Sequence, residues 1–205
     1  MHIAITGNIG AGKTTLARKL SEHYKWGVLY EAVEGNPYLS DFYEDMARWS
    51  FNLQVFFLNS RFSQAQKIRS MHYQTVIQDR TIYEDAFIFA KNLADSKLME
   101  ERDYQNYLML YETMMNAIKA PDLIVYLQAD LPKLRSQIQK RGRDFEQSIS
   151  DEYLLNLNDL YENFAHSYLD GTLLTINVNN LDFESNPEDF ELIVKQMNKA
   201  LGYRE

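Results

Sequence analysis

Short apolar runs alternate with longer stretches of helical period along this chain. β-branched residues and flanking polar positions favour strands for five of these runs, at residues 3–6, 28–31, 75–78, 123–127 and 173–178. Because helical segments separate the runs, the pattern predicts a parallel sheet with right-handed crossovers. Every strand would then end at one edge of the sheet, where ligands bind in such folds. We therefore expect a single α/β domain over residues 1–205 with its site at that edge.

Two of the helical segments carry wide apolar stripes. Helical spacing joins Trp49, Leu53, Phe56, Phe57 and Phe62 in the first, and Tyr104, Leu108, Tyr111, Met115 and Ile118 in the second. Such stripes can pack on the sheet, on a second subunit or on both. The sequence leaves these alternatives open.

A glycine-rich loop follows the first predicted strand at once. Residues 7–14 read Gly-Asn-Ile-Gly-Ala-Gly-Lys-Thr and match the pattern Gly-x-x-x-x-Gly-Lys-Ser/Thr of phosphate-binding loops. Glycines let backbone N–H groups turn towards a polyanion, and the N-terminus of the helix predicted at 15–20 adds to the attraction. A glycine-rich turn without a ligand is the alternative, which this strand–loop–helix context disfavours. The candidate nucleotide-binding residues are Gly7, Asn8, Ile9, Gly10, Ala11, Gly12, Lys13, Thr14 and Thr15.

Composition narrows the class of partner. The chain has 205 residues, a formal net charge of -8 and no cysteine. The negative charge argues against a general nucleic-acid binder, and the lack of cysteine removes disulfides and thiolate chemistry. No apolar run approaches the roughly 18 residues of a membrane span, and no leader pattern begins the chain. We expect a cytoplasmic protein that binds neither nucleic acid nor membrane.

Acidic residues close two of the predicted strands. Glu31 ends the second and Asp79 ends the third, so both should lie at the edge that holds the phosphate loop. A carboxylate there can take a proton from an attacking hydroxyl or hold Mg²⁺, to which Thr14 also offers an oxygen. The adjacent Arg80 can bind phosphate or orient a carboxylate. The alternatives are a solvated strand end for Glu31 and, for Asp79, the N-cap of a helix over 81–91, a role that is compatible with a metal site.

Basic residues gather around a single glycine at 140–147, after an amphipathic helix. Phosphoryl transfer spreads negative charge over the moving group, so Lys140, Arg141 and Arg143 predict a lid that closes on it. A favourable interaction with the helix dipole also explains Lys140 and Arg141, but not Arg143 beyond the glycine.

A weaker signal concerns a pocket for a nucleobase. Gln54 and Arg61 are seven residues apart on one predicted helix, and Asp85 and Phe89 are four apart on another. A Gln side chain offers a donor and an acceptor, a Phe ring can stack, and Arg61 can pair with Asp85. Gln and Arg on a helix are more often surface residues, so this hypothesis is weak by itself.

Together these features resemble the deoxynucleoside kinase family along nearly the whole chain. The stretches Asn-Pro-Tyr-Leu at 36–39, Asp-Phe-Tyr at 41–43 and Arg-Trp-Ser-Phe-Asn-Leu-Gln at 48–54 resemble its bacterial deoxyadenosine/deoxyguanosine kinase branch. The phosphate loop, Glu31, Gln54-x6-Arg61, Asp79-Arg80-x4-Asp85 and Arg141-Gly-Arg143-x2-Glu146 complete the pattern. The resemblance implies a P-loop kinase fold with a five-stranded parallel sheet flanked by helices and a short lid at about 140–148.

The resemblance also implies a role for each site residue. Glu31 would be the general base at the 5′-hydroxyl, Arg80 would hold it and the substrate oxygen, and Asp79 and Thr14 would serve Mg²⁺. Lys13, Arg141 and Arg143 would contact the phosphates of ATP. The remaining matches concern the deoxynucleoside: Tyr43 and Glu146 for the 3′-hydroxyl, Gln54, Arg61 and Asp85 for the base, and Phe89 for stacking. The family is typically homodimeric through long helices.

Three positions depart from the family pattern: Ala32 stands where a proline is common, Asn36 where animal members often carry Trp, and Gln137 where some relatives carry Arg. The expected activity is transfer of the γ-phosphoryl group of ATP to a deoxynucleoside, with a purine and deoxyadenosine favoured. A deoxycytidine or broad-specificity kinase is the first alternative, and a thymidylate-type monophosphate kinase the next. A nucleotide-gated switch is disfavoured, because Asn198-Lys199 continues as Ala-Leu and so lacks the Asn-Lys-x-Asp of GTPases.

Overall fold

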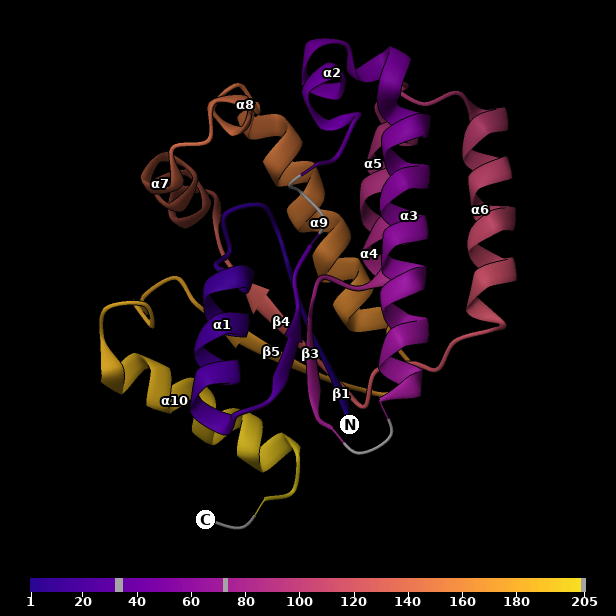
Figure 1. The fold of residues 1–205 in the computed structure, drawn as a ribbon. Helices are drawn as coiled ribbons and strands as arrows, with labels where there is room; N and C mark the ends of the chain where they lie inside the picture. The colour runs from indigo at the N-terminus through magenta and orange to yellow at the C-terminus, as the bar shows by residue number, and fades with distance from the viewer. Residues whose placement is uncertain (32–34, 72–73, 204–205) are drawn as a thin grey trace. The chain divides into compact units, whose positions relative to one another are not determined.

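Five parallel strands form one sheet in the order β2-β3-β1-β4-β5 (Figure 1). The structure is a computed structural model and describes residues 1–31, 35–71 and 74–203. The strands are β1 (His2–Gly7), β2 (Gly27–Leu29), β3 (Val76–Asp79), β4 (Leu123–Gln128) and β5 (Thr172–Asn177). The predicted parallel sheet and all five of its strands are therefore confirmed.

Strand register places the polar strand ends together. Ile5 of β1 pairs with Asp79 of β3, and Gly7 pairs with Leu127 of β4. Asp79 is the last residue of β3, as the pattern predicted for the end of that strand. The expectation that Glu31 closes β2 is wrong, because β2 ends at Leu29 and Glu31 follows two residues later.

The chain divides into two compact units. The sheet unit comprises Met1–Tyr30, Tyr73–Arg80 and Ala120–Glu205, and the helical unit comprises Glu31–His72 and Thr81–Lys119. Besides the strands, the sheet unit contains α1 (Lys13–Tyr24), α7 (Leu131–Arg141), α8 (Asp144–Gln147), α9 (Asp151–Ser167) and α10 (Pro187–Ala200). The helical unit contains α2 (Leu39–Glu44), α3 (Met46–Ser70), α4 (Ile82–Glu84), the π-helix η1 (Asp85–Ala90), α5 (Lys91–Asp95) and α6 (Glu101–Met115).

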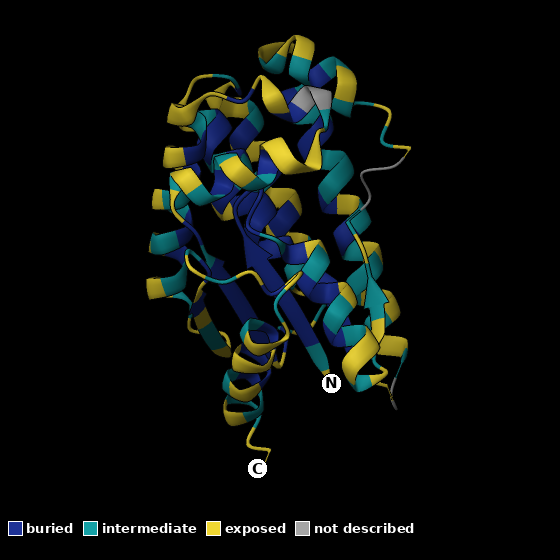
Figure 2. Cartoon of the chain, turned by 90° about the vertical axis from the view of Figure 1, so that its left-hand side faces the viewer, coloured by how far each residue is buried: buried dark blue, intermediate teal, exposed yellow. Residues whose placement is uncertain are grey.

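Apolar side chains from both faces of the sheet make the core of the sheet unit. The alternation of side chains along β1 and β4 points Ile5 and Val125 towards α1 and α10, which contribute Leu16 and Ile193 to the same cluster. Helix α9 lies on the opposite face (Figure 1), where it stacks an aromatic ring on β4. Strands β1, β3 and β4 are buried almost throughout, whereas the edge strands β2 and β5 are partly exposed (Figure 2). A sheet covered on both faces explains why its strands read as continuous apolar runs.

In the helical unit, α3 packs against α2, α6 and η1. The two predicted apolar helices are both present, although α3 extends beyond the predicted stripe to 46–70 and α6 ends at Met115, before Ile118. The side chain of Asp45 accepts a hydrogen bond from the backbone N–H of Arg48 at 3.0 Å and so fixes the start of α3.

Across the described residues, no helix is both long enough and apolar enough to cross a membrane.

Candidate active site

The phosphate loop of residues 7–14 connects β1 directly to α1. Gly12 is the N-cap of α1 with φ +93°, and no described side chain caps that helix end. The first backbone N–H groups of α1 therefore stay available for an anion, and the helix dipole favours one there. Lys13, Thr14 and Thr15 form the first turn of α1. The loop therefore lies between a strand and a helix, as the sequence pattern of phosphate-binding loops requires.

Asn8 organises the interior of this loop. Its side-chain oxygen accepts from the N–H of Ile9 at 2.7 Å, and its side-chain nitrogen donates to the Leu154 carbonyl at 2.9 Å and to Asn158 Oδ1 at 2.7 Å. The ammonium of Lys13, only 5% exposed, donates to the Asn8 carbonyl at 2.8 Å. Asn8 thus fixes the loop to α9, while Lys13 lies along the loop backbone.

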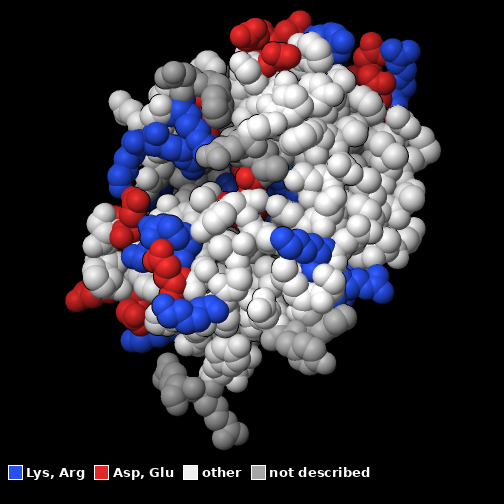
Figure 3. Space-filling view, in the orientation of Figure 1, with Lys and Arg blue, Asp and Glu red and all other residues white. Residues whose placement is uncertain are grey.

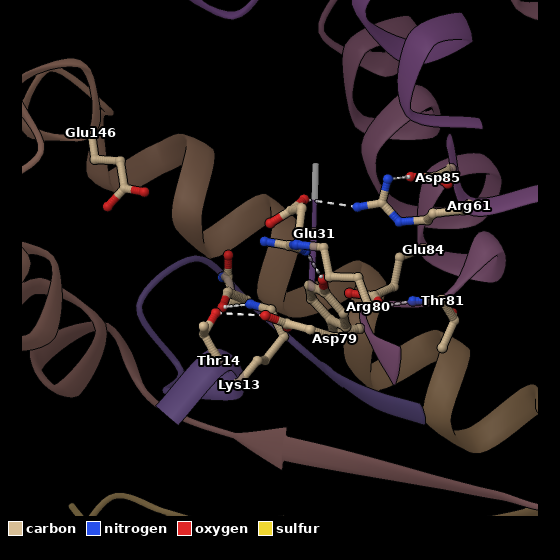
Figure 4. A network of polar contacts seen from close by, with 12 residues as sticks. Lys13, Thr14, Glu31, Arg61, Asp79, Arg80, Thr81, Glu84, Asp85 and Glu146 are labelled. Atoms are coloured by element: carbon tan, nitrogen blue, oxygen red, sulfur yellow. Dashed lines mark hydrogen bonds and ion pairs between the residues drawn. The ribbon is translucent and has the colours of Figure 1, made fainter. Parts of the chain in front are cut away.

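Thr14 and Asp79 face one another across the end of the sheet (Figure 4). The Thr14 hydroxyl donates to Asp79 Oδ2 at 2.6 Å, and Asp79 is 1% exposed. Asp79 is not the N-cap of the next helix, as its alternative role would require. That position belongs to Thr81, whose N–H donates to Glu84 Oε2 at 2.7 Å. The pair instead places two side-chain oxygens beside the phosphate loop, and oxygen atoms are the ligands that Mg²⁺ prefers.

Arg80 leaves the sheet in an unusual backbone conformation. Its φ is +73°, a left-handed value that costs a residue with a Cβ about 1–3 kcal/mol. Its N–H still donates to the Ile5 carbonyl of β1 at 2.9 Å, so the turn is tied to the sheet. Such strain persists where surrounding contacts determine it, and it is common at functional sites.

A buried guanidinium connects two acidic side chains in the helical unit. Arg61 Nη2 donates to Glu31 Oε1 at 2.7 Å, and Arg61 Nη1 lies 3.1 Å from Asp85 Oδ1 (Figure 4). The side chains of Arg61 and Asp85 are 5% and 2% exposed, and that of Glu31 is 20% exposed. The expected pairing of Arg61 with Asp85 is present, whereas the bond from Arg61 to Glu31 was not foreseen. Because a buried charge is costly without a partner, the two carboxylates stabilise Arg61 where it lies.

Two further buried polar groups lie on helices α3 and α6. Gln54 lies two turns before Arg61 on α3 and is only 3% exposed, and within the described structure its Oε1 has no hydrogen-bond partner. The hydroxyl of Tyr107 on α6 is likewise buried without a hydrogen bond to any described residue. Burial, with Asp85 adding to it, raises the pKa of Tyr107 well above its usual range, so the phenol stays neutral. Because Gln54 and Arg61 are both buried, the alternative that they are ordinary surface residues of a helix is wrong.

Asp85 and Phe89 lie on η1, where hydrogen bonds run from residue i to residue i+5. π-helical turns are rare and often occur at functional sites. Phe89 is half-buried on this segment. Tyr43 is half-buried on α2 beside the ring of Phe42, with 5.2 Å between centroids.

Two of the positions that depart from the family pattern precede α2. Ala32 lies outside the described residues, whereas Asn36 accepts a hydrogen bond from the N–H of Tyr38 at 2.9 Å.

The predicted lid begins at the C-terminus of α7. Gly142 caps that helix with φ +68°, and α8 follows. Arg141 Nη1 and Arg143 Nη1 both donate to Glu146 Oε1, at 2.9 and 3.1 Å, while Lys140 pairs with Glu184 at 2.6 Å. Figure 3 shows Lys and Arg gathered over α7 and α8. The arginines are partly exposed, but Glu146 is 4% exposed and its Oε2 has no partner among the described residues.

Sequence reasoning missed the contributions of α9. Leu154 and Asn158 hold Asn8, and Tyr161 accepts a hydrogen bond from Arg80. These residues belong to no motif, and their helical spacing indicates only a packed face. Asn158 also donates to the Ala129 carbonyl at 2.9 Å, so one helix connects the phosphate loop with the end of β4.

A phosphate loop, an oxygen-rich strand end and a basic segment at α7 and α8 are together typical of a P-loop phosphotransferase. Comparison with known proteins narrows this class. A family model for deoxynucleoside kinases matches residues 3–202. A deoxyadenosine kinase of Dictyostelium discoideum is 41% identical over 202 residues, which span 98% of this chain and 81% of that relative. A deoxyguanosine kinase of Bacillus subtilis is 36% identical over 207 residues, with 97% of each chain covered.

A solved structure gives the same result. The deoxyadenosine kinase from M. mycoides, with the products dCMP and a flexible dCDP bound, matches this chain with a TM-score of 0.84 and 31% identity. The match covers 97% of this chain and 100% of that one. The chain belongs to the deoxynucleoside kinase family and is a deoxynucleoside kinase. This result sets aside the monophosphate kinase and the nucleotide-gated switch that the sequence left open.

The glycine at the start of the phosphate loop provides a stability test. A Cβ added at Gly7 would lie 2.7 Å from the Leu127 carbonyl oxygen, and the φ there is +145°. We expect Gly7→Ala to lower the free energy of unfolding by about 2–4 kcal/mol, measured by urea denaturation, because strain and overpacking add.

Gly202→Ala is the matched control. Its φ is +72°, but no described atom lies within 4 Å of the added Cβ, so it should cost only about 1 kcal/mol. Equal losses for the two variants would contradict the packing of β4 against the loop.

Proposed function

We propose that this kinase transfers the γ-phosphoryl group of ATP to the 5′-hydroxyl of a purine deoxynucleoside, with deoxyadenosine preferred. The observation that supports this choice of base is the buried Gln54, whose Oε1 has no partner among the described residues and lies on the same helix as Arg61. A free acceptor suits the amino group at C6 of adenine, whereas guanine carries an acceptor oxygen at that position. The name of the Dictyostelium relative agrees with this preference.

In the proposed reaction, the 5′-oxygen attacks the γ-phosphorus and the bond from that phosphorus to the β–γ bridging oxygen breaks. Glu31 accepts the hydroxyl proton, and the products are a deoxynucleoside monophosphate and ADP. Arg80 orients the reacting carboxylate and alcohol, and Lys13, Arg141 and Arg143 offset the charge on the phosphates. Arg61, at 2.7 Å from Glu31, restrains the proposed base.

Mg²⁺ fits the oxygen ligands of this chain. Thr14 Oγ1 and Asp79 Oδ2, which lie 2.6 Å apart, would hold it directly or through water, and the ion would neutralise charge on the phosphates of ATP. Glu146 Oε2 is buried and has no described partner. It is proposed to accept a hydrogen bond from the sugar 3′-hydroxyl, which Tyr43 is proposed to contact as well. Phe89 is proposed to stack on the base.

Deoxycytidine is the second candidate substrate. Its amino group at C4 is also a donor that suits Gln54 Oε1, and the M. mycoides deoxyadenosine kinase was solved with dCMP and dCDP bound. A site of this kind separates deoxyadenosine from deoxycytidine by the shape of the cavity rather than by the hydrogen bond to Gln54.

A panel of four acceptors tests the substrate. With ATP and Mg²⁺, a coupled assay of ADP release should give the highest kcat/KM for deoxyadenosine, about 10-fold or more above thymidine, because thymine places an acceptor against Gln54. Deoxyguanosine and deoxycytidine complete the panel. Thymidine as the best substrate would refute the proposed role of Gln54, and deoxycytidine as the best would select the second candidate.

Glu31→Gln tests the proposed base. The amide keeps an oxygen for Arg61 but cannot take the proton, so kcat should fall by about 10²–10⁴ with little change in KM. Glu44→Gln, at an exposed residue that ends α2, is the matched control and should keep its kcat. Turnover of Glu31→Gln close to that of the unchanged enzyme would remove Glu31 from the mechanism.

We also propose that the kinase is a homodimer through its long helices. Met109 and Leu110 of α6 are 59% and 38% exposed, and Phe87, whose ring contacts Tyr111 of α6, is 46% exposed. Apolar side chains gathered in this way favour a protein interface.

Sedimentation equilibrium tests the dimer. The unchanged chain should have twice the monomer mass of 24.1 kDa. Met109→Glu should shift it towards monomer, whereas Leu169→Glu, at a leucine that is 91% exposed elsewhere, should not. A monomer at all accessible concentrations, or dissociation by Leu169→Glu alone, would contradict the proposed interface.

A further inference from the structure

Arg80 has a buried partner that the proposed chemistry does not use. Its Nη1 donates to the hydroxyl of Tyr161 on α9 at 3.1 Å, and the two residues are 6% and 0% exposed. A hydrogen bond to a charged group in such surroundings is stronger than an exposed one, and its loss leaves a guanidinium N–H to be satisfied in some other way. The hydroxyl of Tyr161 therefore acts on Arg80 through a direct contact.

The ring of Tyr161 is itself held in place. It stacks on the ring of Tyr126 of β4, with 5.7 Å between centroids and 9° between planes. The Tyr126 hydroxyl donates to Glu162 at 2.9 Å, which raises the pKa of Tyr126 beyond the effect of burial. The ring stack itself, which does not need the Tyr126 hydroxyl, thus supports the Tyr161 ring whose hydroxyl contacts Arg80.

The backbone of Arg80 is fixed as well. Its φ of +73° and the hydrogen bond from its N–H to Ile5 leave the side chain as the variable part of the residue. An arginine side chain has many rotamers, and ordering it costs conformational entropy. A buried phenol that accepts one N–H of the fork selects among those rotamers before substrate arrives, which is the condition for efficient catalysis by a positioned cation.

We infer that Tyr161 is a positioning residue for phosphoryl transfer, which holds the guanidinium of Arg80 in its reactive orientation through the phenol oxygen. This inference rests on the proposed role of Arg80. Packing alone accounts for an aromatic ring at position 161, since Phe would fill the same space. It does not account for a hydroxyl that contacts a catalytic candidate.

Tyr161→Phe removes the hydroxyl and keeps the ring. We expect kcat with deoxyadenosine to fall about 10- to 100-fold while the KM values for deoxyadenosine and ATP stay nearly constant, because the substrates still bind but Arg80 is misplaced. The matched control is Tyr126→Phe, which keeps the stacked ring that supports Tyr161 and removes a hydroxyl that bonds Glu162 rather than Arg80. It should lower the thermal midpoint but keep kcat.

A double-mutant cycle separates this inference from the proposed function. If Tyr161 acts through Arg80, Arg80→Lys lowers kcat and the double variant Arg80→Lys with Tyr161→Phe loses little more. Unchanged kcat in Arg80→Lys would refute the role of Arg80 and the inference with it. A loss in Arg80→Lys with normal kcat in folded Tyr161→Phe, fully additive losses, or an equal kcat loss in Tyr126→Phe would overturn the inference alone. Should Tyr161→Phe not fold, Tyr161→Met, which fills buried space adaptably, carries the same expectations.

Discussion

The sheet unit depends on a backbone connection between β1 and α1 that leaves no space for a side chain at any of its three glycines. A Cβ at Gly7, Gly10 or Gly12 would meet the Leu127 carbonyl, the Leu134 carbonyl or the ring of Phe183, each within 2.8 Å. Strand β4, helix α7 and the segment before α10 therefore pack directly on the loop backbone. Asn8 ties the same loop to α9. The elements that surround the loop consequently fix its shape, and the N-terminus of α1 is presented to phosphate without reorganisation.

The helical unit is organised around a buried charge rather than around a loop. Arg61 lies among apolar helices, and removing either partner of such a charge is far more costly than losing an exposed ion pair. Glu31 and Asp85 provide the compensating carboxylates. One guanidinium thus links the proposed general base with the residue expected to read the nucleobase. If the proposed roles of Glu31 and Asp85 hold, binding of the nucleobase and placement of the general base act on the same cation, because both carboxylates pair with Arg61.

Local patterns predicted much of this molecule. Apolar runs revealed the strands, and the spacing of glycine, lysine and threonine revealed the phosphate loop, because these signals lie within a few residues of one another. Seven-residue spacing on α3 indicated the shared face of Gln54 and Arg61. The bond from Arg61 to Glu31, the π-helical turn at Asp85 and the support of Asn8 and Arg80 by α9 were not predictable, since each depends on contacts between distant segments. The end of β2 at Leu29 was missed for a related reason, because pairing with β3 rather than local propensity ends it.

The central claim is that the Glu31 carboxylate is the general base that takes the proton from the 5′-hydroxyl of the substrate. The most direct measurement is a crystal structure with deoxyadenosine and a non-hydrolysable ATP analogue bound. The account predicts a Glu31 carboxylate oxygen within about 2.6–3.2 Å of the 5′-oxygen, which is the reach of a general base. The account would be contradicted if the Glu31 carboxylate were bonded to Arg61 alone and another residue bound the 5′-hydroxyl.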